Sequence, residues 1–479
     1  MRAKWSYLVF SSLAIVCSGA AYAASVSMPD IRGPLADTDT KGVLVWNLEK
    51  ANYLAEEYLL SGKADVYEPV AMADAANMLT RNNVADMAQR DFSLKTLKTA
   101  QPYTTRILVY KPVDPRKFSG NVIVETLHPL GGGSSIVWNM LNAYFIGHGD
   151  AYIGVQHPST FAGLKAAAPG RPGRYDDLSM SDNTQLWSSI AQAGMLARSN
   201  ASSSPFKGYA VKHLYLTGYS FTGAATTTFA NWHHETAVLA NGQHIFDGYV
   251  SNANSMYNRP IGAPVMRMNT QSDFDSFGGL NNRRGDSDAK NARYRLYEVA
   301  GAAHVTRPVD PAPGAIQPRA PIGGVASANQ PRFSPHACTK QFPVGSQPNA
   351  FPLHLAMAAM FDNMYRWVHK GIAPPRAPRI ETNSDGTTRR DADGNAIGGL
   401  RMPPIDVPIA AYDVGHGDEC FLFGYQQSFS QEKKRSKYGS SAAYVEAVKK
   451  SAEEKVNEHW LLPNAVDELT AAARAVDKF

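Results

Sequence analysis

The sequence predicts an α/β fold in which helices flank a mostly parallel central sheet and a C-terminal elaboration packs on it. Two observations predict this fold. Short apolar stretches of β-favouring residues recur between positions 104 and 299, and stretches with a helical pattern separate them. Strands that alternate with helices form parallel sheets covered on both faces, and sites then form at the carboxyl ends of the strands.

Seven stretches have the composition of strands, at 104–110, 121–126, 151–155, 214–216, 248–250, 264–268 and 294–299. Helical patterns fall between them at 137–144, 185–198 and 223–232. Ahead of these elements, residues 46–60 favour either a helix or a strand that runs into Gly62.

The last third of the chain has a different character. Residues 306–348 are rich in Pro, Gly, Ser and Ala without a hydrophobic period, which indicates a covering loop. The pattern then predicts an amphipathic helix at 353–370, a turn-rich loop at 391–399 and helical structure at 438–479. We therefore divide the chain into a signal peptide (1–23), an α/β core (24–305), and a cap loop with a C-terminal helical elaboration on the core (306–479).

The N-terminus has the pattern of a secretory signal peptide. Arg2 and Lys4 precede a short apolar run, and Ala21-Tyr22-Ala23 fits a small-residue cleavage site. We expect cleavage after Ala23 and an exported protein, periplasmic or secreted, without a stable membrane anchor; a leader that stays as an anchor is the alternative. The leader holds two of the 47 basic residues and none of the 42 acidic ones, so the mature chain is nearly neutral and nucleic acid is not an expected partner.

The chain contains three cysteines, of which Cys17 leaves with the signal peptide. Cys338 and Cys420 remain as an even pair in an oxidising compartment, which favours a disulfide. Two buried free thiols are the alternative.

The stretch around Ser220 indicates a nucleophile. A strand at 214–216 and the helix that follows it force Gly218-Tyr219-Ser220-Phe221-Thr222-Gly223 to turn sharply. A serine on such a turn projects its hydroxyl above the sheet, close to the free N–H groups of the helix. Thr222 stands where glycine is usual, and the glycine comes one residue later. A structural serine on a tight turn is the alternative, and Gly132-Gly133-Ser134 is a second Gly-x-Ser string.

A serine needs a base to take its proton, and the base needs an acid to orient it. In α/β-hydrolases these groups follow in the order Ser, acid, His, each after a strand, and this chain supplies that order. Asp273 follows the 264–268 strand and is the predicted acid, with Asp275 as the runner-up. His304 follows the 294–299 strand through a small-residue loop and is the predicted base; a surface histidine is the alternative.

An oxyanion hole needs two donors. The N–H of Phe221, directly after the serine, is the first. The second is expected from the loop at 127–133, which contains His128 and three glycines that allow a close backbone approach. His128 itself either points into the site or has a structural role.

We expect neither a metal nor a cofactor. His233-His234-Glu235 lacks a third ligand at suitable spacing, so helix capping or a surface position explains it better. The His-bearing loop at 415–420 is better explained as a loop fixed by Cys420. Gly131-Gly132-Gly133 is not a phosphate loop because no Lys-Ser/Thr follows it.

With these residues in place, the chain resembles the exported bacterial "alpha/beta hydrolase domain" family over nearly the whole mature sequence. The resemblance is carried by 57–64, 103–109, 118–125, the Ser220 turn and 300–304 (Ala-Gly-Ala-Ala-His), and later by 367–371, 374–375 and 393–401. The resemblance implies an α/β-hydrolase fold and a serine-hydrolase mechanism, and it leaves the substrate open.

Two positions depart from the family pattern. Phe221-Thr222-Gly223 stands where the family usually has Gln-Ser-Gly, which makes the later glycine a family trait. Thr270-Gln271-Ser272-Asp273 stands where the family often has Thr-Glu-x-Asp, so Asp273 is the acid that remains if the family uses the glutamate.

The sequence thus predicts an exported serine hydrolase that cleaves a small-molecule carboxylic ester through Ser220, His304 and Asp273. A lactone or an amide is the alternative substrate, since the same groups serve all three. A catalytically silent relative that binds a ligand is the alternative from another class.

Overall fold

The computed structural model describes residues 25–36, 48–68, 91–129, 133–166, 172–276, 283–306, 342–414, 422–476 and 478–479. Several features predicted above lie outside the described residues. They are the signal peptide, Cys338, Cys420, the 415–420 loop and most of the 306–348 loop.

A nine-stranded sheet forms the centre of the molecule, in the order β1-β2-β3-β5-β4-β6-β7-β8-β9. The strands are β1 (Asp30–Arg32), β2 (Tyr53–Tyr67), β3 (Thr96–Pro112), β4 (Asn121–Thr126), β5 (Ala151–Val155), β6 (His213–Tyr219), β7 (Gly248–Asn252), β8 (Val265–Thr270) and β9 (Tyr294–Val299). From β5 to β9 every neighbouring pair is parallel, whereas β1, β2, β3 and β5 pair antiparallel. The predicted mostly parallel sheet is therefore confirmed.

Alternation along the strands directs side chains to two separate layers of helices. In β4, Ile123 packs in a cluster with side chains of α3 (Ile136–His148) and α9 (Leu353–Lys370). Its neighbours Val122 and Val124 pack on the other face, with α5 (Gln185–Arg198) and α6 (Phe221–Thr228). A strand buried on both faces has to be apolar throughout, which is why β4 reads as a continuous apolar run.

Strand β2 passes through Gly62 rather than ending there, contrary to the expectation that the element stops at this glycine. A Cβ on Gly62 would lie 2.3 Å from the side-chain oxygen of Gln192 and 3.1 Å from the ring of Tyr103. The glycine therefore serves close packing of β2 on α5, and it does not break the strand.

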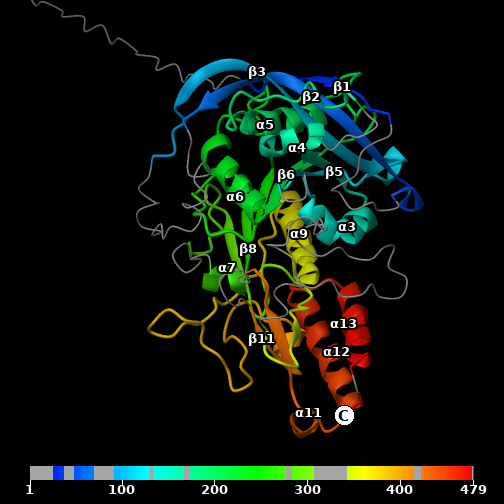
Figure 1. Ribbon diagram of the computed structural model, residues 1–479, viewed down its shortest axis with the longest axis vertical. Coiled ribbons are helices and arrows are strands. Elements are labelled where there is room, and N and C mark those ends of the chain that lie inside the picture. The colour runs from blue at the N-terminus through cyan, green and yellow to red at the C-terminus, as the bar shows by residue number, and fades with distance from the viewer. Residues whose placement is uncertain are drawn as a thin grey trace, which may run out of the picture.

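The C-terminal region lies at the opposite end of the molecule from β1–β3 (Figure 1). It contains a small sheet in the order β10 (Gln347–Pro348), β12 (Tyr425–Ser428), β11 (Ala410–Asp413). It also contains two helices, α12 (Ser441–Asn457) and α13 (Asn464–Arg474), whose apolar side chains join the same cluster as α9 and β9. Helix α12 begins after Ser440, whose hydroxyl accepts a hydrogen bond from the N–H of Ala443. The division of the chain after residue 305 stays a prediction.

The remaining elements are short or peripheral. They are η1 (Glu49–Ala51), η2 (Pro115–Lys117), η4 (Pro158–Thr160), α4 (Phe161–Ala166), η5 (Phe229–His233), α7 (Gln271–Ser276), β10 (Gln347–Pro348), α10 (Pro403–Asp406), β11 (Ala410–Asp413), β12 (Tyr425–Ser428), α11 (Gln431–Tyr438), α12 (Ser441–Asn457) and α13 (Asn464–Arg474). Within the described ranges, none of the helices has both the length and the apolarity to cross a bilayer.

Candidate active site

Ser220 stands at the turn between β6 and α6 in a strained conformation. Its backbone has φ 57° and ψ −124°, a region that side-chain-bearing residues rarely adopt and that tends to mark functional sites. The N–H of Ser220 donates to the carbonyl of Asn252 on β7 at 3.1 Å, which holds the turn in place. This is the backbone geometry of a nucleophile elbow, on which the serine side chain projects from the carboxyl end of the sheet.

Two glycines and Thr222 explain the unusual spacing of this turn. A Cβ on Gly218 would lie 2.1 Å from the carbonyl oxygen of Thr222, and one on Gly223 would lie 2.0 Å from that of Asn252. Thr222 occupies the usual glycine position because its hydroxyl closes the turn: it donates to the carbonyl of Tyr219 at 3.0 Å and accepts from the Tyr219 N–H at 3.1 Å. The later glycine is required because the Asn252 carbonyl of β7 lies where its Cβ would be.

Asp273 and His304 are brought together by the ends of β8 and β9. Oδ1 of Asp273 lies 2.5 Å from Nδ1 of His304, and both side chains are buried. The second carboxylate oxygen of Asp273 accepts from the N–H and the hydroxyl of Thr270 at 2.7 and 2.8 Å. Asp275 instead accepts from Thr388 and from Gln271, so of the two predicted acids Asp273 is the one that contacts the histidine.

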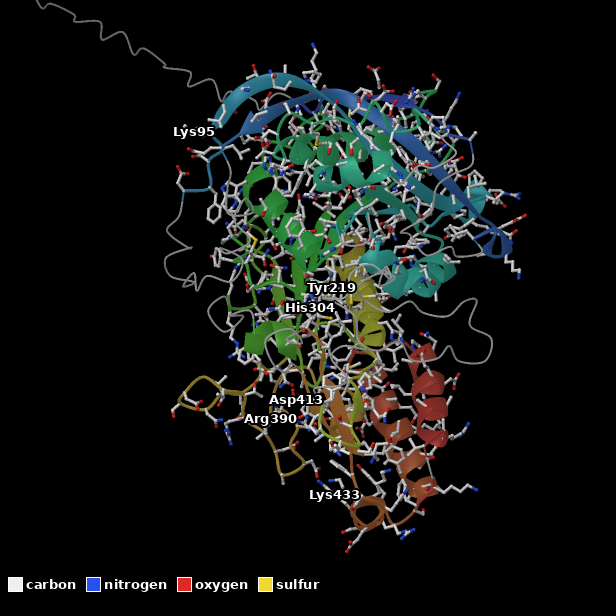
Figure 2. The ribbon with its side chains drawn as sticks, in the orientation of Figure 1. Lys95, Tyr219, His304, Arg390, Asp413 and Lys433 are labelled. Atoms are coloured by element: carbon white, nitrogen blue, oxygen red, sulfur yellow. The ribbon has the colours of Figure 1, made fainter. Side chains whose placement is uncertain are left out.

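The backbone of His304 is fixed on both sides. Its N–H donates to the hydroxyl of Ser272 at 2.9 Å, and its carbonyl accepts from the hydroxyl of Tyr219 at 2.8 Å. The rings of Tyr219 and His304 also pack with their centroids 5.3 Å apart, and Figure 2 labels both residues near the centre of the molecule. Because Tyr219 directly precedes Ser220, these contacts join the serine turn to the histidine loop.

Gln271 stabilises the same loop. Its side-chain oxygen accepts from the N–H of Gly301 at 2.9 Å. Gly301 has a positive φ of 81°, so a turn that favours glycine leads the chain from β9 to His304. At the position where the family often has glutamate, this chain therefore uses an amide to hold the histidine loop.

The structure shows that one donor of His128 is already in use, and its role in the site stays a prediction. Its N–H donates to the carbonyl of Ser134 at 2.8 Å, and the N–H of Ser134 donates back at 2.9 Å, so the backbone donor of His128 is already in use. Its ring lies against that of Phe221, with centroids 6.1 Å apart. Phe221 begins α6, so its N–H has no partner within the helix and remains suited to an oxyanion.

The His128 ring is neutral over the usual pH range. Burial lowers the pKa of His128 to about 3, and the nearby His304 and His157 lower it further in the same direction. His157, at the end of β5, also packs on Phe221, with ring centroids 5.3 Å apart, and burial lowers its pKa to about 4. Sequence reasoning missed His157, whose position directly after a predicted strand was the available signal.

Glu125 is a second residue that sequence reasoning passed over, because it was counted as part of the β4 strand. Its carboxylate is fully buried and accepts from the N–H groups of Val137 and Trp138 at 2.8 and 3.2 Å and from the Tyr152 hydroxyl at 2.9 Å. Burial raises the pKa of Glu125 to about 7. Glu125 thereby holds the first turn of α3, the helix that follows the predicted oxyanion loop.

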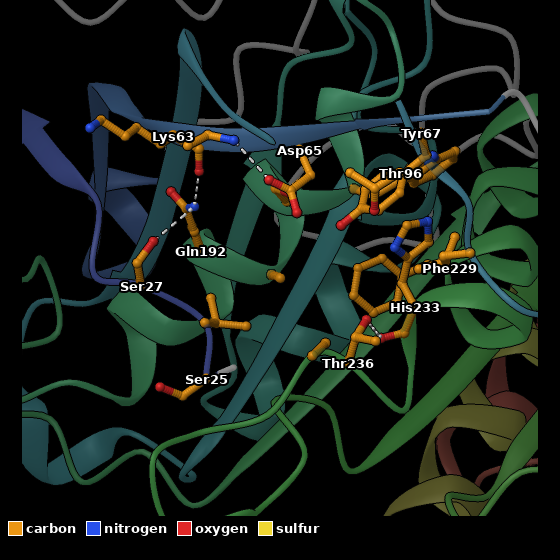
Figure 3. A pocket seen from close by; sticks show the side chains of 17 residues that line it. Ser25, Ser27, Lys63, Asp65, Tyr67, Thr96, Gln192, Phe229, His233 and Thr236 are labelled. Atoms are coloured by element: carbon orange, nitrogen blue, oxygen red, sulfur yellow. Dashed lines mark hydrogen bonds between the residues drawn. The ribbon is translucent and has the colours of Figure 1, made fainter. Parts of the chain in front are cut away.

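A cavity of about 610 Å³ lies elsewhere, at the far end of the helix that begins at Ser220 (Figure 3). It is lined by side chains of β2, α5 and η5, among them Lys63, Asp65, Tyr67, Gln192 and His233. None of Ser220, Asp273 and His304 lines it, so this cavity is separate from the serine site.

The strand order, the strained serine between β6 and α6, and the Asp273–His304 pair at the ends of β8 and β9 define an α/β-hydrolase architecture. The chain belongs to the Alpha/beta hydrolase domain family, whose model matches residues 26–471. Membership supports hydrolase activity and leaves the substrate open.

Several solved structures match part of this chain. A protein described as an alpha-beta serine hydrolase homologue from Coxiella burnetii is 12% identical, with a TM-score of 0.28, over 42% of this chain and 84% of the other. A putative dienelactone hydrolase from Klebsiella pneumoniae is 12% identical, with a TM-score of 0.24, over 50% and 85%. A Xanthomonas campestris protein described as a serine hydrolase without a lid is 13% identical, with a TM-score of 0.25, over 42% and 80%. No curated protein matches the sequence.

Proposed function

We propose that this protein is a serine hydrolase that cleaves a carboxylic ester, with Ser220 as nucleophile, His304 as general base and Asp273 as the orienting acid. The observation that carries the proposal is the buried hydrogen bond between Asp273 and Nδ1 of His304. Such a bond places the proton of the neutral ring on Nδ1 and makes Nε2 the basic nitrogen. The hydroxyl of Tyr219, which donates to the His304 carbonyl, connects this pair to the strained turn at Ser220.

In this mechanism, Ser220 Oγ attacks the ester carbonyl while its proton passes to Nε2 of His304. Asp273 stays ionised and stabilises the imidazolium. The tetrahedral intermediate collapses to an acyl-enzyme, and the imidazolium gives its proton to the departing alcohol. Water then attacks the acyl-enzyme with the same base, which releases the acid and restores Ser220.

The developing oxyanion requires donors that are already in position. The N–H of Phe221, at the start of α6, is the proposed first donor. The second is proposed from the 127–133 loop. It is either the side chain of His128 or the N–H of a residue after Pro129, since the N–H of His128 itself is engaged with Ser134.

The substrate is proposed to be a small-molecule ester that the exported, mature chain meets outside the cytoplasm. A lactone or an amide would use the same groups, so the class of acyl compound is decided by a substrate series. A silent binding protein would keep the fold without turnover.

The experiment compares hydrolysis of p-nitrophenyl acetate and butyrate by the mature protein and its Ser220→Ala variant. Removing the attacking oxygen should lower turnover by at least about 10⁴-fold, because a triad serine supplies most of the chemical rate enhancement. Circular dichroism checks that the variant is folded. Ser220→Ala with wild-type turnover would overturn the nucleophile assignment, and a folded wild type without turnover on esters, lactones and amides would favour the binding protein.

A further inference from the structure

We propose that His234, Glu235 and His244 form a binding site for one divalent transition-metal ion of the Zn²⁺ type. The site lies where the helical segment that starts at Ser220 ends, after η5. The sequence pointed away from a metal because His233-His234-Glu235 lacked a third ligand. The structure supplies it in His244, ten residues along the chain.

The three side chains converge. Each offers a ligand atom, and the three atoms lie within 4.8 Å of one another. Nε2 of His244 is 4.0 Å from a carboxylate oxygen of Glu235, and the imidazole rings of His234 and His244 stack with centroids 4.0 Å apart. Among the described residues this is the one group of three potential ligands that meets this distance criterion.

Nε2 of His234 is the strongest single indication of a ligand. His234 is almost fully buried, and within the described part of the chain its Nε2 has no hydrogen-bond partner. A buried polar atom without a partner is costly, so native structures usually satisfy such atoms with protein, water or an ion. A metal ion between the two imidazoles and the carboxylate would satisfy it.

The opposite nitrogens of both rings are already held, as metal-binding histidines require. Nδ1 of His234 lies 2.9 Å from the hydroxyl of Tyr249 on β7. Nδ1 of His244 lies 2.9 Å from the backbone carbonyl of His234, which can only accept. That carbonyl places the proton of His244 on Nδ1 and leaves the lone pair of Nε2 free for an ion.

The backbone also suits ligation. His244 is held opposite Val238 in an antiparallel bridge, and the N–H of Ile245 donates to Ala237 at 2.9 Å. This short hairpin returns the chain to the helix end and positions His244 before any ion binds.

Two imidazoles and one carboxylate are a ligand set that Zn²⁺ accepts, with a fourth position left for water. Ligand atoms about 2.1 Å from a tetrahedral ion are about 3.4 Å apart, so binding draws this group together by about 1 Å. The His234 and His244 rings stack with only 19° between their planes, so one ring must also turn, because an imidazole ligates in its own plane. The partly exposed side chains of Glu235 and His244 can make both movements. Arg259, 3.7 Å from Glu235, competes for the carboxylate and should weaken the site without removing it.

The test uses the mature protein, freed of metal with a chelator and dialysed, then titrated with Zn²⁺ by calorimetry. Bound zinc is counted by mass spectrometry, and Co²⁺ provides a second readout through its visible absorption. We expect one ion per chain. His244→Ala should weaken binding by more than about 100-fold, because losing even an outer partner of a ligand costs about 10- to 100-fold. Glu235→Gln should also weaken it, and neither exposed change removes a core side chain.

His369→Ala is the matched control. His369 stacks on His213 with centroids 4.2 Å apart, and its Nε2 lies 3.0 Å from the hydroxyl of Tyr215. His213 lies near Asp247, but in the described part of the chain these three side chains do not bring their ligand atoms within 4.8 Å of one another. Its replacement should leave one zinc bound with unchanged affinity. The proposal is overturned if the wild type binds no stoichiometric zinc, or if His244→Ala binds it as tightly as the wild type.

Discussion

The two histidine sites at the two ends of the helical segment 221–234 differ in what holds Nδ1. His304, beside the start of the segment, is held by the carboxylate of Asp273 at 2.5 Å. His234, at its end, is held by the hydroxyl of Tyr249 at 2.9 Å. A carboxylate stabilises the imidazolium that forms when the ring takes a proton. A phenol hydroxyl is uncharged and orients the ring without stabilising a positive charge on it. A histidine side chain therefore suits proton transfer or metal ligation according to the group that holds its Nδ1.

The backbone differs at the two ends as well. Ser220 adopts a strained conformation at the start of the segment, with φ 57° and ψ −124°. At the other end, Phe229–His233 winds as a π-helix, a form that is rare and concentrated at functional sites. Both departures from regular helix fall next to the proposed chemistry.

The largest of these effects is expected from replacing Asp273, the charged partner of His304. Asp273→Asn should lower turnover by about 10⁴-fold, because the amide cannot stabilise the imidazolium and favours the wrong tautomer. Asp275→Asn is the matched control, since Asp275 contacts Thr388 and Gln271 and not His304. Steady-state kinetics on the ester series measures both variants. A comparable loss in Asp275→Asn with Asp273→Asn still active would exchange the two assignments.

Glu125 extends the comparison to a buried carboxylate without a basic partner. Its pKa is raised to about 7 in the folded protein by burial, against 4.5 when exposed. Between these values the native state keeps a proton that the unfolded state has lost, so the contribution of Glu125 to stability is complete below about pH 4.5 and falls as pH rises through 7. A shift of this size corresponds to about 3 kcal/mol.

Glu125→Gln removes this titration. The free energy of unfolding, measured in urea at pH 5 and pH 8, should therefore fall less between the two pH values in the variant than in the wild type. The slope is the readout, because any constant loss from the changed hydrogen bonds to Val137 and Trp138 cancels between the two pH values. Equal slopes in both proteins would show that Glu125 does not titrate in this range.

A smaller effect is expected from replacing Tyr249, the uncharged partner of His234. Tyr249→Phe keeps the ring in the core and removes the hydroxyl beside His234, so zinc affinity should fall by about 10-fold. Ester turnover should stay at the wild-type level, because Tyr249 contacts the far end of the helical segment. Calorimetry and kinetics on the same preparation separate the two sites. A joint loss of zinc binding and turnover in a folded variant would contradict their independence.

The regular elements were largely predictable from sequence. The predicted stretches 121–126, 151–155, 185–198, 294–299 and 353–370 coincide with β4, β5, α5, β9 and α9. These segments are buried continuously or carry a clear helical period, so local composition alone identifies them. The path of β2 through Gly62 was not predictable, because it depends on the distant side chains of Tyr103 and Gln192.

Sequence alone was likewise insufficient where a candidate site depends on contacts between distant residues. The order of Ser220, Asp273 and His304 was readable because each follows a strand, but the choice between Asp273 and Asp275 needed the direction of the side chains in α7. The engagement of the His128 N–H depends on its pairing with Ser134, six residues further along the chain. His244 escaped notice for a similar reason, since a hairpin brings it to His234.

The central claim is that Ser220 is an activated nucleophile. The measurement is treatment of the mature protein with a fluorophosphonate, followed by mass spectrometry of the peptides, with Ser134→Ala as a control for the second Gly-x-Ser string. We expect a single phosphonylated residue, Ser220, in both the wild type and the control. Asp273→Asn should carry no adduct on the same time scale. A folded wild type that carries no adduct, or that carries it at another serine, would contradict this claim.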